Sequence, residues 1–150
     1  MKTLPPEPKP RLGPEHERLS VFVGSWTSEG VTGDLGSGRM QMAQRHTYEL
    51  LPGGFFLIHR WEGRIGQMDN QGIEIIAPDR SQFFDGSGWA RTYDVSVDGN
   101  AWRFVGERER AEMVFTNDGD TMYVTWEQTK DGSSWTVLCE VKATKMRARR

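Results

Sequence analysis

Side chains alternate between apolar and polar types over many short segments of this chain, and this alternation limits the folds it can adopt. Within residues 39–50, for example, Met40, Met42 and Tyr48 lie between mostly polar neighbours. Because successive residues of a strand point to opposite faces of a sheet, a period of two predicts strands with one buried face. Asp-Gly pairs, which favour tight hairpin turns, occur at Asp85-Gly86, Asp98-Gly99, Asp118-Gly119 and Asp131-Gly132.

The alternating segments and the turns between them predict about ten strands. Their expected bounds are 24–31, 38–50, 54–63, 70–77, 81–86, 89–97, 101–107, 110–116, 121–129 and 134–144. No long helical pattern separates the strands, so we expect antiparallel, up-and-down connections rather than parallel crossovers. Closing such a sheet removes its exposed edges. The sequence therefore predicts an all-β barrel, with a two-sheet sandwich as the alternative and a propeller disfavoured because no fixed repeat is present.

Residues before the first strand divide into two parts. Residues 1–13 are rich in proline and are expected to be extended or disordered. A short helix is predicted to begin at Pro14, with Leu19, Phe22 and Val23 on one face, and to end at Gly24. We thus expect a lead-in over 1–13, a single barrel domain over 14–144 and a basic tail over 145–150.

Length and charge narrow the classes of function. A chain of 150 residues forms one domain most readily, and no apolar segment approaches the roughly 18 residues of a membrane-spanning helix. The N-terminus lacks the apolar core of a secretory signal, and Cys139 is the single cysteine, so a cytoplasmic protein without internal disulfides is expected. The formal net charge is −2, and five basic residues lie among the last nine. The remaining acidic body disfavours nucleic-acid binding.

Four segments of the chain resemble a known family. They are "HERLSVFVGSW", "LLPGGFFLIHRWEG", "GIEIIAPDRSQFFDGSG" and "DGSSWTVLCEVKATK", and together they are similar to the domain of unknown function 1579 family, which belongs to the lipocalin-like, or calycin, barrels. The resemblance implies a ten-stranded barrel with an internal cavity and implies no particular reaction. On this basis Trp26 is expected to close one barrel end against Phe22, with Gly24 and Gly30 allowing close approach of the first strand.

Polar side chains that interrupt the apolar face are the candidates for contact with a ligand. We predict a ligand-binding set in the barrel interior, with Gln44, Tyr48 and Gln128 as further inward positions, and the set is His46, His59, Trp61, Arg91 and Tyr93. Arg91 is expected to pair with a ligand carboxylate or with an acidic side chain at the rim. The remaining tryptophans either line a cavity or fill it, and they are Trp89, Trp102, Trp126 and Trp135.

His46 and His59 are expected to be near neighbours on adjacent strands, where they would bond to a ligand or to the wall, exchange a proton, or bind a metal. Glu74 lies between Ile73 and Ile75 and is therefore expected to face outward, which leaves a metal site incomplete. No metal and no cofactor are predicted. Haem is disfavoured, because nitrobindin-type barrels resemble this chain in the Gly-x-Trp step but carry an axial His near their C-terminal strands, and no His follows His59. Cys139 is expected to be a buried, inert thiol.

Three hypotheses about function follow from the sequence. The first is a barrel that binds a small, partly apolar ligand, with neither nucleic acid nor membrane as a partner. The second is a cofactor-free isomerase or cyclase in which His46 or His59 moves a proton. The third is a fully packed barrel that forms a homodimer through Phe56, Ile58 or Tyr123.

Overall fold

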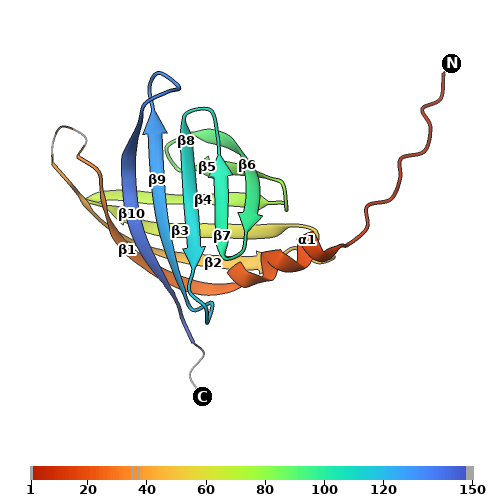
Figure 1. Cartoon of the computed structure of the whole chain (residues 1–150), viewed down its shortest axis with the longest axis horizontal. Helices are drawn as coiled ribbons and strands as arrows, with labels where there is room; N and C mark the ends of the chain where they lie inside the picture. Colours follow the sequence, from red (N-terminus) through yellow and green to blue (C-terminus); the bar gives the residue numbers. More distant parts are fainter. Residues whose placement is uncertain (1, 35, 37, 148–150) are drawn as a thin grey trace.

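In the computed structural model, which describes residues 2–34, 36 and 38–147, ten strands form the body of the molecule (Figure 1). Every boundary lies within three residues of the one predicted from the alternation. The strands are β1 (Gly24–Thr32), β2 (Gln41–Leu50), β3 (Leu57–Ile65), β4 (Met68–Ile76), β5 (Arg80–Asp85), β6 (Ala90–Asp98), β7 (Ala101–Val105), β8 (Glu109–Phe115), β9 (Thr121–Thr129) and β10 (Trp135–Lys145).

The strands close into a barrel with up-and-down order. Each strand pairs antiparallel with its neighbours in the sequence, and β1 pairs with β10 to complete the ring. The predicted all-β, antiparallel barrel is thus confirmed, and the sandwich is excluded. Closure leaves no unpaired sheet edge among the described residues, and it directs alternate side chains of every strand into a common interior.

A short helical segment lies at one end of the barrel (Figure 1). It consists of α1 (Pro14–Glu17) followed by the 3-10 helix η1 (Arg18–Phe22). Leu19 and Phe22 are fully buried, as predicted, whereas Val23 is exposed, which corrects its predicted place on the same face. A 3-10 helix has three residues per turn, so Leu19 and Phe22 align and the next residue points away from the barrel.

Aromatic side chains seal the barrel end beneath this helix, which we call the base. The Phe22 ring lies 5.1 Å from the rings of Trp102 and Phe115 and 5.3 Å from that of Tyr48. The indole Nε1 of Trp26 donates a 2.8 Å hydrogen bond to the carbonyl oxygen of Phe22. The predicted role of Trp26 as a closure of the barrel end is therefore confirmed.

The two glycines expected to permit close approach do so in different ways. Gly24 has a φ of +138°, in the region that favours glycine. A Cβ atom at Gly30 would lie 2.0 Å from the backbone oxygen of Glu140 on β10, so only glycine fits where these strands pair. This contact draws β1 and β10 together at the seam of the barrel.

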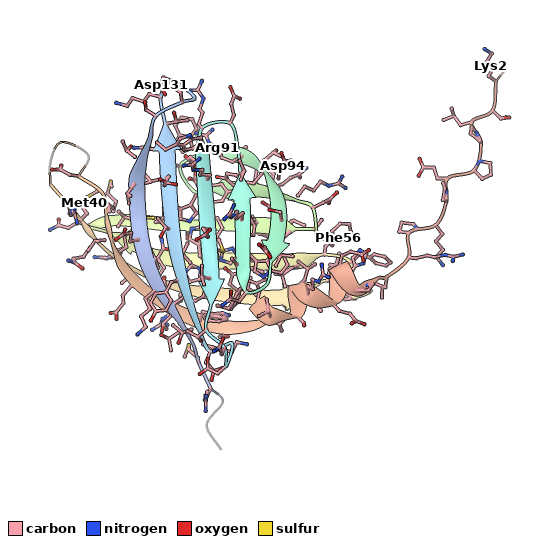
Figure 2. All side chains as sticks on the ribbon, viewed as in Figure 1. Lys2, Met40, Phe56, Arg91, Asp94 and Asp131 are labelled. Carbon is pink, nitrogen blue, oxygen red and sulfur yellow. The ribbon has the colours of Figure 1, made fainter. Side chains whose placement is uncertain are left out.

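The described residues that flank the barrel lie outside its interior. Residues 2–13 contain no helix or strand and extend from the body, with Lys2 far from the strands (Figures 1 and 2). The predicted basic tail begins at Lys145, the last residue of β10, while 148–150 lie outside the described residues. Among the helices described here, none has the length and apolarity needed to cross a membrane.

Candidate functional site

The barrel interior contains a cavity of about 180 Å³. It lies beside the aromatic base and extends toward the opposite end, where the turns following β3, β5, β7 and β9 are located. Its walls combine aromatic rings with methionine and aliphatic side chains, and the aromatic members are Tyr48, Trp61, Phe83, Tyr93 and Trp126. A fully packed barrel, the premise of the third hypothesis, is therefore not what this chain forms.

The tryptophans predicted to line or fill the interior have different places. Trp61 and Trp126 line the cavity, whereas Trp102 belongs to the base. Trp89 is 58% exposed at the start of β6, and Trp135 lies half-buried against the guanidinium of Arg110. Trp89 precedes β6, near the rim, where a side chain can leave the interior. Trp135 points outward because the β9–β10 register shifts between Val137 and Cys139, which reverses the side-chain alternation at the start of β10.

The two predicted histidines are in direct contact. The ring atoms His46 Nδ1 and His59 Nε2 are 2.9 Å apart. In the β2–β3 register, Tyr48 is opposite His59 and Trp61 is opposite His46, so the histidines are diagonal neighbours on the inner face. The Tyr48 ring stacks on His59 with a centroid distance of 4.0 Å, which fixes the orientation of that imidazole.

Glu74 faces the interior, and the prediction that it faces outward is wrong. Glu74 is on β4, directly opposite His59 on β3, and its side chain is buried. Its Oε1 atom is 3.2 Å from His59 Nδ1. The isoleucines that flank it in the sequence are half-buried on the outer surface instead. On this part of β4 the apolar side chains point outward and the polar one points inward, the reverse of the usual pattern. Hydrogen bonds from its polar neighbours stabilise the buried Glu74 carboxylate.

Two serines extend this contact into a continuous chain of hydrogen bonds. Ser28 Oγ on β1 lies 2.8 Å from His46 Nε2, and Ser81 Oγ on β5 donates to Glu74 Oε2 at 2.9 Å. One side chain from each of five consecutive strands thus takes part. We call this set the lumen relay, and its members are Ser28, His46, His59, Glu74 and Ser81.

Donor and acceptor requirements set the direction of the relay. A Glu74 carboxylate can only accept hydrogen bonds, so Nδ1 of His59 carries the hydrogen and donates it to Glu74 Oε1. His59 Nε2 then accepts from Nδ1 of His46, and His46 Nε2 accepts from the Ser28 hydroxyl. Burial, and secondarily the charge that His59 can carry, lowers the pKa of His46 from 6.5 to about 3, so His46 is neutral near neutral pH.

A second polar group lies near the other side of the cavity. The Tyr93 hydroxyl donates a 2.9 Å hydrogen bond to Glu109 Oε2, and burial together with this carboxylate raises the pKa of Tyr93 well above its usual value. Arg91 does not line the cavity. Its Nε atom is 3.8 Å from Glu109 Oε1 and its guanidinium lies 4.5 Å from the ring of Trp89, toward the barrel end that carries Asp131 (Figure 2).

Gln44 and Asn70 form a third polar group, on the wall beside the lumen relay. Gln44 Nε2 donates to Asn70 Oδ1 at 2.7 Å, and the indole of Trp61 donates to the same oxygen at 2.9 Å. Because an indole N–H only donates, it fixes the acceptor atom of Asn70 and therefore which side of the Gln44 amide faces it. Gln44 lines the cavity as predicted, and the predicted inward Gln128 does not.

Cys139 lines the cavity, and burial raises the pKa of its thiol to about 12. The thiol is therefore protonated and unreactive, as expected. Within residues 2–34, 36 and 38–147, no group of three His, Cys, Asp or Glu side chains is arranged to hold a metal ion. His46 and His59 instead direct their ring nitrogens to each other and to the two ends of the relay.

Of the predicted ligand contacts, four line the cavity and one does not. His46, His59, Trp61 and Tyr93 are brought together around it, and Arg91 is at the rim. Ser28, Ser81 and Glu109 are part of the site but were not among the residues predicted from the sequence. The alternation of β1 does place Ser28 on the same face as Trp26, which is the one signal that identifies it as inward.

Several solved structures share this fold, and two of them are described here. The crystal structure of Rv2717c from M. tuberculosis aligns with a TM-score of 0.62 and 14% identity, over 91% of this chain and 100% of that one. The S-type phycobiliprotein lyase CPES from Guillardia theta aligns with a TM-score of 0.58 and 10% identity, over 89% of this chain and 93% of that one. At these identities the likeness concerns the fold alone.

No curated protein matches the sequence. A family model described as "Protein of unknown function (DUF1579)" matches residues 11–145, which include the helix at the base and all ten strands of the barrel. The chain therefore belongs to the domain of unknown function 1579 family.

Proposed function

We propose that this protein is a binding barrel for a small, planar, mostly apolar ligand that carries one hydrogen-bonding group. The observation that supports the proposal is an aromatic cavity with a continuous hydrogen-bonded relay along one wall. Small-ligand sites combine apolar walls with a few fixed polar groups in this way.

The size of the cavity limits the ligand. An apolar protein cavity of about 150 Å³ holds benzene, and this one measures about 180 Å³. A ligand of one aromatic ring with a short substituent fits without movement of the wall. Ring stacking and edge contacts with Trp61, Trp126 and Phe83 would hold its faces.

The charges around the cavity indicate a neutral ligand. Glu74 and Glu109 both line it, whereas Arg91 does not. A ligand carboxylate would meet two like charges in a poorly solvated space, without the guanidinium that the sequence analysis had considered as its partner. A ligand hydroxyl or carbonyl group directed at Ser28 or Gln44 is the better match, because both ring nitrogens of His46 are already engaged.

Titration with phenol and with benzoate, followed by tryptophan fluorescence, tests this proposal. We expect saturable quenching by phenol and at least about tenfold weaker binding of benzoate. Val124→Phe, which fills the cavity, should abolish phenol binding, whereas Val105→Phe, which changes an exposed position on β7, should not. Equal binding of phenol by both variants would contradict a site in the lumen.

A second function, general acid–base catalysis by a cofactor-free isomerase or cyclase, is favoured by one observation. His46 is held neutral beside the cavity and is linked through His59 to a carboxylate. Because its Nε2 atom is engaged by the Ser28 hydroxyl, a proton from a bound substrate would reach this imidazole through that hydroxyl. If this function is correct, the His46→Ala variant would still bind an identified substrate but would no longer convert it. The homodimer through Phe56, Ile58 or Tyr123 stays a prediction.

A further inference from the structure

From the contacts at the cavity end of the lumen relay, we propose that the barrel hydrolyses small neutral esters, with Ser28 as the nucleophile and His46 as its base. The proposal rests on the ligand cavity described above, because the ester must reach the lumen. It adds a reaction and a covalent intermediate, which binding alone does not require.

The first support is the geometry of the nucleophile and its base. Ser28 Oγ lies 2.8 Å from His46 Nε2 and borders the cavity. A serine hydroxyl and an imidazole within hydrogen-bonding distance, with the imidazole oriented by a third group, are the arrangement that activates a serine. Here the third group is His59, whose Nε2 atom is 2.9 Å from the Nδ1 atom of His46.

Glu74 completes the order of a serine, a base and an acid. It accepts from His59 at 3.2 Å and from Ser81 at 2.9 Å, so it is fixed behind both imidazoles. In serine enzymes the buried acid holds the tautomer of the base and stabilises the imidazolium that forms, and the same roles recur on unrelated folds. Here a second imidazole lies between them: as His46 Nε2 takes the serine proton, the Nδ1 proton of His46 can pass to His59 Nε2, so that the positive charge lies on the ring next to Glu74 rather than on His46.

A donor for the developing oxyanion is present next to the serine. Gln44 is directly opposite Ser28 in the β1–β2 register and lines the cavity. One hydrogen of its amide is committed to Asn70 Oδ1, and the bond from Trp61 to that same oxygen fixes the orientation. The second amide hydrogen is therefore the candidate donor to a carbonyl oxygen bound beside Ser28.

The reaction balances with these groups and water alone. Ser28 Oγ attacks the acyl carbon as its proton passes to His46 Nε2, and the bond to the alkoxy group breaks as His46 returns that proton to the departing alcohol. Water then attacks the acyl-serine in the same manner, which releases the carboxylic acid and restores the Ser28 hydroxyl. The released acid ionises beside Glu74 and Glu109, and like-charge repulsion favours its departure.

The test uses the full chain with 4-nitrophenyl acetate and with a fluorophosphonate probe that modifies activated serines. We expect one fluorophosphonate adduct per chain in intact-mass spectra, mapped to the peptide that contains Ser28. Ser28→Ala should lose the adduct and lower ester hydrolysis at least about 100-fold, whereas Ser96→Ala, an exposed serine on β6, should keep both. His46→Gln should slow modification about 10²- to 10⁴-fold.

Circular dichroism checks that each variant folds, and the mapped adduct on the unaltered chain does not depend on any variant. An adduct at Ser28 supports the proposal. An unmodified chain or an adduct at another residue would overturn it, and so would a Ser28→Ala variant modified to the same extent as the unaltered chain. Phenol titration separates this result from the binding proposal: phenol binding without an adduct at Ser28 refutes the ester hydrolysis only, and the absence of both refutes both.

Discussion

Lowering the pH from 7 to 5 should weaken the barrel by about 2 kcal/mol through His46 alone. Burial first, and the neighbouring His59 second, lowers the pKa of His46 from 6.5 to about 3. Because the pKa is lower in the folded state, the unfolded chain binds this proton first. The stability contributed by a neutral His46 is therefore complete above pH 6.5 and is lost progressively as the pH falls toward 3.

The magnitude follows from the width of that pH window. Each pH unit at which the unfolded chain binds one more proton lowers the free energy of unfolding by about 1.4 kcal/mol. Protonation of the unfolded His46 begins slightly above pH 6.5, and integration from pH 7 to pH 5 gives about 2 kcal/mol. Since single domains are stable by roughly 5–15 kcal/mol, the loss should be plain in a denaturation curve.

Urea denaturation followed by tryptophan fluorescence at pH 7, 6 and 5 measures this effect. The matched protein is His46→Gln, whose side chain keeps hydrogen-bonding groups and does not titrate. We expect the variant to be less stable at pH 7 and to lose about 2 kcal/mol less than the unaltered chain on going to pH 5. Parallel pH profiles for the two proteins would refute a neutral, buried His46.

Three further predictions concern the base, the seam and the thiol. Trp26→Phe removes the hydrogen bond to Phe22 and leaves a buried carbonyl unpaired, so the free energy of unfolding should fall by about 1–3 kcal/mol in urea denaturation. Gly30→Ala places a methyl group 2.0 Å from the Glu140 oxygen and should cost more than about 3 kcal/mol, seen as a fall in the thermal midpoint. Cys139, with a pKa of about 12, should resist iodoacetamide at pH 8 in the folded chain and react fully in urea, as measured by intact mass.

The fold was readable from the sequence because each strand has one buried face. The alternation identified all ten strands, and the errors in their bounds are three residues or fewer at each strand end. Trp89 continues the inward alternation of β6 but precedes the strand, and it lies exposed at the rim. Val23 was likewise misplaced at the end of the helix, because a 3-10 turn changes which residues share a face.

The site was only partly readable. His46 and His59 were found because imidazoles on an apolar face are uncommon, whereas Ser28 and Ser81 carry no such signal. Glu74 was misplaced because polarity indicates the direction of a side chain only when the outer face is polar, and here isoleucines lie there. The register that aligns Glu74 with His59 becomes visible only when β3 and β4 are paired.

Because aromatic side chains seal the base, we expect exchange between the cavity and solvent at the opposite end of the barrel, away from the helix. The helix leads in from residues 2–13 at the sealed side, and β10 finishes there as well, since Lys145 pairs with Trp26. A linker, tag or carrier attached at either terminus would therefore be located at the base and would leave the opposite end of the barrel accessible. If ligands enter and leave at that same end, release of one ligand has to precede binding of the next.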